Sequence, residues 1–452
     1  MKNILLGILL STSLLLVSCG IEPDPVANIE ILSSTVNGAN SSEANLDVPV
    51  EVSIVIVFSS ALNPAEFQTA FTVEGGGSPA VYTLAYSNAT TKVTANMTLD
   101  FNTTYTVKIA HKTIGANGAV LQSLRSFTFK TAVDEVIRSM TPCTNVGDCM
   151  RSVELNGSQG NGTFEFYSNY PIYEEKAQWE NLTRAVIVVH GASHDPLNYF
   201  GYMTNTFETQ SFSENTVLIA PFFRNTSTES LQDFFWTNTS WRRGRPSSNS
   251  NRISSFEAID ELIDQLSDKI RFPVLSKIII TGHSSGATFT HVYAAANTSE
   301  SKHPSIDFEY VVANAQFFYY PSVQRINESN DQLFTPTGCP AYTVWPLGYN
   351  AVPPYLAGVT ASTFNAQFVD RNITYLLGNG SQSDPTLNTE DCENTIQGSS
   401  RFDRGENMFK FMELAYPGIH NQKKVIVNGI GHDGQGMYQS SEFKLLLTQL
   451  LK

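Results

Sequence analysis

The chain reads Lys277-Ile278-Ile279-Ile280-Thr281-Gly282-His283-Ser284-Ser285-Gly286 at the end of an apolar run, and a helix-compatible run then extends to Ala295. The pattern G-x-S-x-G therefore lies between a predicted strand and a predicted helix. Its two glycines are needed because side chains at those positions would collide with the strand or the helix around a strained serine. The N-terminus of the helix also directs a positive dipole toward a developing anion. Ser284 is therefore predicted to be a nucleophile.

The sequence around this turn alternates strands with helices. The predicted strands are continuous apolar runs, as in strands buried on both faces of a parallel sheet: 185–189, 216–220, 277–280, 310–313, 373–377 and 424–427. Ser254 and Glu257 match a capping box for a helix that precedes Lys277, and residues 441–450 form a predicted closing helix. This pattern predicts an α/β fold, a mostly parallel sheet with helices on both faces.

A histidine follows the last predicted strand, in Asn428-Gly429-Ile430-Gly431-His432-Asp433-Gly434. In folds with this serine turn the catalytic order along the chain is serine, acid and histidine. Small residues on both sides of His432 would let the loop bring its imidazole over the serine. His432 is the predicted general base, and the alternative is an exposed loop histidine.

The acid is expected on the loop after the strand at 373–377. That loop offers Asp384, Glu390 and Asp391. Asp384 is predicted to be the acid because it lies closest to the end of the strand. The other two carboxylates remain alternatives, and any that are not used would be solvated loop charges.

The chain from about Arg184 to Met437 resembles a group of secreted α/β hydrolases. The resemblance rests on 199–200, 234–241, 254–257, 282–286, 310–314 and 398–405. It implies an α/β-hydrolase fold and serine-triad hydrolysis of ester or related acyl bonds, with neither a metal nor an organic cofactor. The sequence departs from the group at Gly378–Asp384, because relatives usually place an aspartate a few residues after the glycine. The position of the acid therefore stays open by a few residues.

The strand at 185–189 ends in His190-Gly191-Ala192. In many α/β hydrolases a His-Gly pair at this position opens the loop of the oxyanion hole. By that resemblance the backbone amides of Ala192 and Ser285 are the expected oxyanion donors. His190 itself is expected to orient the loop.

The N-terminal part has a different pattern. From about Val26 to Ala132, short strands with period-two alternation are separated by Gly/Asn/Ser turns, with no convincing helix, which predicts a β-sandwich. The segments 57–64, 99–107 and 127–131 resemble bacterial Ig-like domains. This resemblance implies a spacer or an adhesive module that contacts a surface partner, and spacing is the favoured role.

The first residues indicate export. Lys2 precedes an apolar run from Ile4 to Val17, and Leu16-Val17-Ser18-Cys19 resembles a bacterial lipobox. The resemblance implies a signal peptide over 1–18, a lipid anchor on Cys19 and a place in the bacterial cell envelope, at the outer membrane or cell surface. The alternative is a plain secretory peptide with a chance cysteine.

Four cysteines remain after Cys19, and three connectivities are possible. Cys143 and Cys149 enclose a short Asn/Gly/Asp loop that would close at low cost, so we pair them and leave Cys339 with Cys392. Free thiols are the alternative. No cysteine has the spacing of a zinc motif.

At 452 residues the chain exceeds the roughly 250–300 residues of a single core. The expected organisation is a linker at 19–26, an Ig-like domain at 27–132, a connector at 133–150 and an α/β-hydrolase domain at 151–452. The net charge of -14, without a clustered basic surface, argues against nucleic acid as a partner.

Two functional hypotheses follow from these patterns. The first is a lipid-anchored serine hydrolase that acts on extracellular esters, small or polymeric. The second is a catalytically silent hydrolase fold that serves as a surface binding or adhesion lipoprotein.

Overall fold

The computed structural model describes residues 27–43, 45–134, 136–225 and 233–452. The chain divides into two compact units, 1–135 and 136–452. The expected signal peptide, Cys19 and the linker at 19–26 lie outside the described residues. Among the helices described, none is long and apolar enough to cross a membrane.

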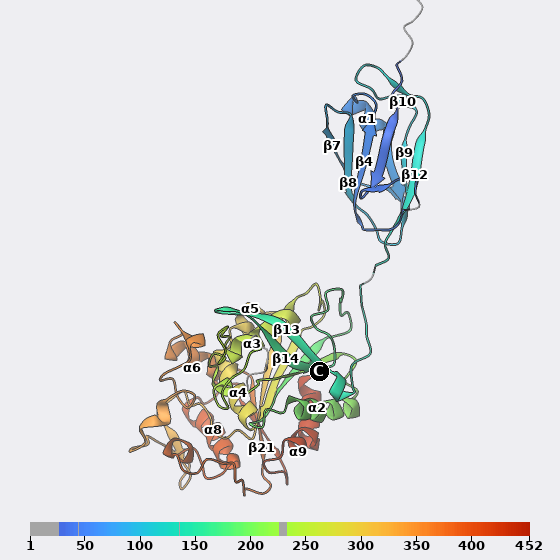
Figure 1. Ribbon diagram of the computed structural model, residues 1–452. Helices are drawn as coiled ribbons and strands as arrows, with labels where there is room; N and C mark the ends of the chain where they lie inside the picture. Colours follow the sequence, from blue (N-terminus) through green and yellow to red (C-terminus); the bar gives the residue numbers. More distant parts are fainter. Residues whose placement is uncertain (1–26, 44, 135, 226–232) are drawn as a thin grey trace, which may run out of the picture. The chain divides into compact units, whose positions relative to one another are not determined.

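The first unit is a β-sandwich (Figure 1). Its first sheet has the order β2-β1-β4-β8-β7: Ala39–Asn40, Ile31–Val36, Glu51–Phe58, Lys92–Thr98 and Thr83–Ser87. Its second has the order β3-β12-β9-β5-β6: Asn45–Val48, Arg125–Thr131, Thr104–Ile109, Phe71–Gly75 and Ser78–Pro79. A small ribbon pairs β10 (Lys112–Thr113) with β11 (Val120–Leu121). The expected alternation is present in β4, where every second residue is buried.

One short helix in this unit corrects the expectation that it has none. Helix α1 (Pro64–Ala70) begins at Asn63, whose side chain accepts hydrogen bonds from two amides of the first turn. Pro64 suits the first helical position because its missing N–H needs no partner there. The buried ring of Phe67 stacks on Phe71 at 5.5 Å, so the helix covers an edge of the core.

The second unit is built on a sheet of eight strands in the order β13-β14-β16-β15-β17-β18-β21-β22. Their bounds are Met150–Gly157, Gly160–Ser168, Thr216–Pro221, Arg184–Val189, Lys277–His283, Asp307–Ala313, Ile373–Gly378 and Lys423–Val427. The six strands from β16 to β22 run parallel, and all six were predicted. The antiparallel hairpin of β13 and β14 was not predicted, because its residues alternate in burial and form no continuous apolar run.

Helices cover both faces of this sheet (Figure 1). One face packs against α2 (Pro196–Gln210), α9 (Gly434–Gln439) and α10 (Ser441–Leu450). The other packs against α3 (Ser255–Ser267), α4 (Ser285–Ala296), α6 (Ala361–Asp370) and α8 (Arg401–Ala415). The predicted capping box of Ser254 and Glu257 starts α3, and α10 is the predicted closing helix. Sheet order and helix placement are those of the α/β-hydrolase fold.

The expected connector at 133–150 is largely part of the second unit. Ile137 forms a β-bridge with Ala177, and the amide of Cys143 donates to the carbonyl of Asn169 at 2.8 Å. The contacts of this segment therefore place the boundary near residue 135.

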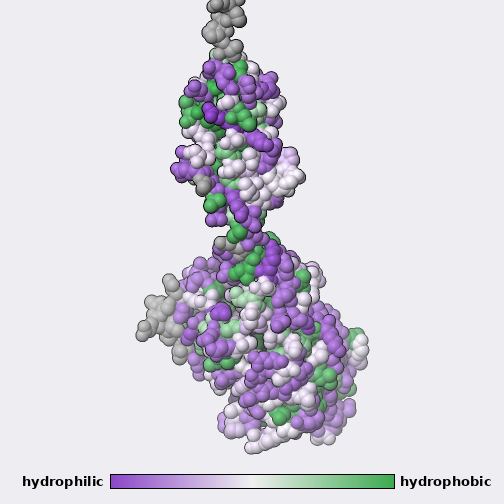
Figure 2. Space-filling view, turned by 90° about the vertical axis from the view of Figure 1, so that its right-hand side faces the viewer, coloured by the Kyte–Doolittle hydropathy of each residue, from purple (hydrophilic) through white to green (hydrophobic). Residues whose placement is uncertain are grey.

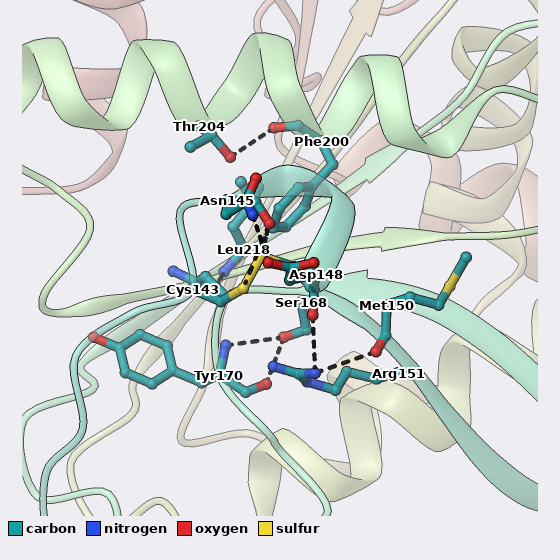
Figure 3. Close-up of a disulfide and its surroundings, with 12 residues drawn as sticks. Cys143, Asn145, Asp148, Met150, Arg151, Ser168, Tyr170, Phe200, Thr204 and Leu218 are labelled. Carbon is teal, nitrogen blue, oxygen red and sulfur yellow. Dashed lines mark hydrogen bonds between the residues drawn. A yellow bond between two sulfur atoms is a disulfide. The ribbon is translucent and has the colours of Figure 1, made fainter.

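Both expected disulfides are present. Cys143–Cys149 closes a loop beside the segment that follows β14 (Figure 3). Cys339–Cys392 joins a segment that precedes β21 in the chain to one that follows it, 53 residues apart. Cys392 begins the short helix α7 (Cys392–Thr395). The expected free-thiol alternative is therefore excluded for these four residues.

The surface of the second unit visible in Figure 2 is mostly hydrophilic, with small scattered apolar areas. Exposed apolar residues such as Ile270 and Ile419 occur singly along the chain. Such residues are ordinary on protein surfaces and need no functional explanation.

The two disulfides should differ in their contribution to stability. Loop closure predicts about 4 kcal/mol for the bridge that spans 53 residues and about 2.2 kcal/mol for the one that spans 6. Replacing Cys339 and Cys392 together by Ala should therefore lower the urea midpoint of the second unit more than replacing Cys143 and Cys149 together. Equal midpoints for the two double variants would contradict this ranking.

Candidate active site

Ser284 lies at the sharp turn between β17 and α4, where its backbone has φ 58° and ψ -116°. This left-handed conformation is strained for a residue with a side chain. A Cβ on Gly282 would lie 2.2 Å from the carbonyl oxygen of Gly286, and a Cβ on Gly286 would lie 2.2 Å from that of Val189. Because these neighbours are backbone atoms, both positions accept only glycine. The turn has the geometry that the sequence predicted for a nucleophile elbow.

The two amides expected to form an oxyanion hole are both available. Ser285 is the first residue of α4, so its N–H has no partner within the helix. Neither this amide nor that of Ala192 donates a hydrogen bond to any part of the chain that the structure describes. These two donors therefore remain free for an anionic oxygen.

His190 holds the loop that carries Ala192. The Nδ1 of its buried ring lies 2.8 Å from the carbonyl oxygen of Gly191, and its Nε2 accepts from the amide of Phe223 at 3.2 Å. Burial lowers the pKa of His190 to about 3, so the ring is neutral at physiological pH. With both nitrogens engaged, His190 acts as an orienting residue.

His432 and Asp384 come from the loops after β22 and β21, and the structure brings them together. Nδ1 of His432 lies 3.2 Å from one carboxylate oxygen of Asp384. The other oxygen accepts hydrogen bonds from the amide and the hydroxyl of Thr386, at 2.9 and 2.6 Å. Asp384 is thus held in the orientation needed to support the imidazole.

The alternative acids have other surroundings. Asp391 accepts a hydrogen bond from the side-chain amide of Asn388 at 2.6 Å and precedes α7. Glu390 is exposed. Neither forms an ion pair with His432 within the described part of the chain.

Arg401 is a site residue that the sequence analysis did not single out. Its Nε donates to the same oxygen of Asp384 that faces His432, and both side chains of this ion pair are less than a tenth exposed. A second nitrogen of the guanidinium donates to the Thr386 hydroxyl at 3.1 Å. The available signal was its position directly after Ser400, which caps α8, in the 398–405 segment.

Arg401 sets the electrostatics of the pair. Burial alone would raise the pKa of Asp384, but hydrogen bonds from Thr386 and Arg401 outweigh it and lower the pKa well below its usual range. Burial and the charge of Arg401 lower the pKa of His432 to about 4, although Asp384 acts in the opposite direction. At neutral pH the carboxylate is therefore ionised and the imidazole is neutral, as a general base requires.

Asn314 links the two loops that carry His432 and Asp384. It follows β18, is buried, and has φ 50°. Its side-chain amide donates to the carbonyl of Gly431 at 2.9 Å and accepts from the amide of Gly378 at 2.9 Å. One side chain therefore fixes the start of both loops.

The nucleophile and the base are not hydrogen-bonded to each other in the structure. Nε2 of His432 is buried without a partner, and its ring stacks on that of His283 at 4.9 Å, next to Ser284. The hydroxyl of Tyr199 holds Nδ1 of His283 at 2.9 Å. A hydrogen bond between a catalytic nucleophile and its base is often long or poorly aligned before substrate binds, and it tightens in the complex with substrate.

Several large aromatic side chains of the second unit serve mostly in packing. They are all nearly inaccessible: Trp236, Trp241, Phe317, Phe318, Tyr319 and Tyr320. Within the described chain, a metal-like cluster is found at Cys339, Cys392 and Glu393, but its two sulfurs are joined in a disulfide and provide no thiolate.

Comparison with known proteins separates the two units. Residues 32–131 match the bacterial Ig-like domain family, so the first unit is a bacterial Ig-like domain. Among curated proteins, none matches this sequence.

Solved structures of esterases and serine hydrolases are similar to the chain at low identity. LpqC, the poly(3-hydroxybutyrate) depolymerase from Bordetella parapertussis, is 17% identical with a TM-score of 0.45, over 64% of this chain and 86% of that one. Poly(aspartic acid) hydrolase-1 from Sphingomonas sp. KT-1 is 18% identical with a TM-score of 0.45, over 67% and 98%. An S-formylglutathione hydrolase from Agrobacterium tumefaciens is 12% identical with a TM-score of 0.36, over 70% and 98%. The strand order of the sheet, rather than these likenesses, defines the fold of the second unit.

Replacing Arg401 by Gln should raise the pKa of His432 from about 4 toward its ordinary value near 6.5. The imidazolium would then keep the attraction of Asp384 and lose the repulsion of the guanidinium. NMR titration of the imidazole groups measures this shift without requiring turnover.

Two variants control for other effects of that change. Arg401→Lys keeps the cation and should leave the pKa of His432 low. Lys410→Gln removes a positive charge from the exposed side of the same helix and should have no effect. An unchanged pKa of His432 in Arg401→Gln would refute the electrostatic role of Arg401.

Proposed function

We propose that the second unit is a serine hydrolase that cleaves ester or related acyl bonds. The observation that carries the proposal is the backbone of Ser284, which has a positive φ in a turn whose positions 282 and 286 admit only glycine. Strain of this kind persists only where the surrounding structure enforces it, and it is concentrated at functional sites. The paired His432 and Asp384, on loops at the same edge of the sheet, supply the remaining groups of a triad.

The proposed reaction passes through an acyl-enzyme. Ser284 attacks the carbonyl carbon while His432 accepts its proton, and the imidazolium then returns that proton to the departing alcohol. Asp384 orients the imidazole and stabilises its charge. The amides of Ala192 and Ser285 would bind the oxyanion, and water activated by His432 would release the acyl group.

We also propose that the protein lies outside the cytoplasm. The two disulfides suit an oxidising compartment, and bacterial Ig-like domains fit an envelope protein. Cys19 would hold the chain to a membrane through lipid, and the Ig-like unit would act as a spacer that also offers a surface to a partner. The substrate would then be an extracellular ester, either small or polymeric.

Substitutions in the triad should have unequal effects. Ser284→Ala and His432→Ala should each lower kcat on the order of a million-fold, because nucleophile and base act as one unit. Asp384→Asn should cost about ten-thousand-fold and leave slow labelling of Ser284 by a fluorophosphonate probe. Hydrolysis of short and long p-nitrophenyl esters, with probe labelling in parallel, measures all three.

The alternative acids provide matched controls. Asp391→Asn and Glu390→Gln should leave turnover close to that of the unmodified protein. Loss of activity in either, with Asp384→Asn still active, would move the acid to the neighbourhood of Cys392. A folded protein that never labels at Ser284 would instead support a catalytically silent surface-binding protein.

Replacing Cys19 by Ala should release the protein from membranes. Stable anchoring requires the several acyl chains of a bacterial lipoprotein, since one chain binds only weakly. Detergent-phase partitioning of the full chain before and after the change tests this. A variant that still partitions with detergent would show that another element holds the protein.

A further inference from the structure

Arg242 is a partly buried cation beside the nucleophile, and it has no acidic partner in the described part of the chain. Its Nη1 donates to the hydroxyl of Ser285 at 2.8 Å, one residue from Ser284. Its Nε is buried and unpartnered, and no ion pair joins it to a carboxylate in the described part of the chain. Burial, together with the charges of Arg243 and Arg401, lowers the pKa of Arg242 to about 10, so the side chain remains charged at neutral pH.

The backbone around Arg242 fixes its position. Arg242 belongs to the short 3-10 helix η2 (Trp241–Arg243), which ends at a glycine with φ 68°. The hydroxyl of Ser255 donates to the carbonyl of Trp241, and the indole of Trp345 donates to the carbonyl of Arg243 at 2.8 Å. The guanidinium is therefore held in place before any ligand binds, which lowers the entropy cost of binding.

Arg242 also lines a cavity of about 180 Å³. Its guanidinium carbon lies 5.4 Å from the ring centre of Phe317, which lines the same cavity. The segments 341–347 and 388–394 form much of the wall, and the disulfide Cys339–Cys392 ties these two segments together. The disulfide therefore restrains this part of the wall, and Arg242, which lines the cavity, contacts the residue next to the nucleophile.

A partly buried guanidinium without a counter-ion has lost part of its hydration, and a bound anion offsets that loss. The planar fork of arginine matches a carboxylate, with two parallel N–H···O hydrogen bonds. Asp391 and Glu393 also line the cavity, so a negative group placed far from Arg242 would be repelled. These charges favour a carboxylate close to the reacting carbonyl.

On this basis we propose that Arg242 is a specificity-determining residue that selects esters carrying a free carboxylate within a few bonds of the scissile carbonyl. This inference rests on the proposed hydrolase function and names its substrate class. Half-esters of short dicarboxylic acids, or esters of short hydroxy acids with a free carboxyl end, have this chemistry.

Paired substrates test the proposal on the acyl side. The mono-p-nitrophenyl ester of glutaric acid and p-nitrophenyl pentanoate have the same number of acyl carbons and differ in the carboxylate. We expect kcat/KM to be higher for the anionic ester by at least about tenfold, because charge-assisted hydrogen bonds to Arg242 would stabilise its binding. Arg242→Gln should remove this preference for the anionic ester, and Arg242→Lys should retain part of it.

The alcohol side is tested in the same way, with 4-acetoxybenzoate and 4-methylphenyl acetate. A preference for the anionic member of this pair would place the carboxylate on the leaving group. Arg245→Gln is the matched control, because that guanidinium contacts the carbonyl of Ala351 and does not line the cavity. Both ratios should stay unchanged in this variant. The proposal is overturned if the unmodified protein prefers neither anionic ester, or if Arg242→Gln lowers both members of a pair equally.

A binding measurement separates this proposal from the hydrolase function. Calorimetry should show that the mono-anilide of glutaric acid, which is anionic, binds more tightly than pentananilide. This difference in affinity should disappear in Arg242→Gln. Binding without probe labelling of Ser284 would leave the carboxylate site intact and refute the hydrolase. Labelling without selective binding would retain the hydrolase and refute the role of Arg242.

Discussion

The contact between backbone atoms at the turn of residues 282–286 is the constraint on which the second unit depends. The start of α4 lies so close to the ends of β15 and β17 that no side chain fits at Gly282 or Gly286. Because α4 is buried along its whole length, this approach is fixed by the core and is not a local choice. The core therefore forces Ser284 into its strained position and frees the amide of Ser285 at the same time.

The electrostatics of the site result from two arginines with different surroundings. Arg401 is neutralised by Asp384, and the pair keeps the carboxylate ionised although burial acts to raise its pKa. Arg242 is partly buried nearby and has no such partner in the described chain. Arg401 thus stabilises the charge of Asp384 within the site, whereas Arg242 is the residue that we propose to bind a carboxylate of the substrate.

Much of the fold followed from local sequence patterns. Continuous apolar runs located the six parallel strands, and the capping residues of α3 and the G-x-S-x-G turn were legible because each depends on residues adjacent in the chain. The hairpin β13–β14 and helix α1 were missed. In the hairpin the burial alternates, and α1 is set by a single capping asparagine in a β-rich region.

The site shows the same division between local and distant information. Ser284 and His432 could be proposed from motif and order, and the structure places Asp384 beside His432. The roles of Arg401, Asn314 and Arg242 depend on contacts with residues 17, 117 and 43 positions away. Such partners are set by the packing of the sheet and its loops, so no local pattern in a single sequence identifies them.

The ion pair of Asp384 and Arg401 makes the proposed catalytic acid a residue that also stabilises the fold, which is uncommon. Active-site groups usually reduce stability, so their loss often makes a protein more stable. Here the proposed catalytic acid is also the counter-ion of a guanidinium that is almost fully buried, and removing one partner of such a pair strands the other charge. A descendant that lost its activity by drift would therefore still be selected to keep Asp384, or would have to lose Arg401 with it.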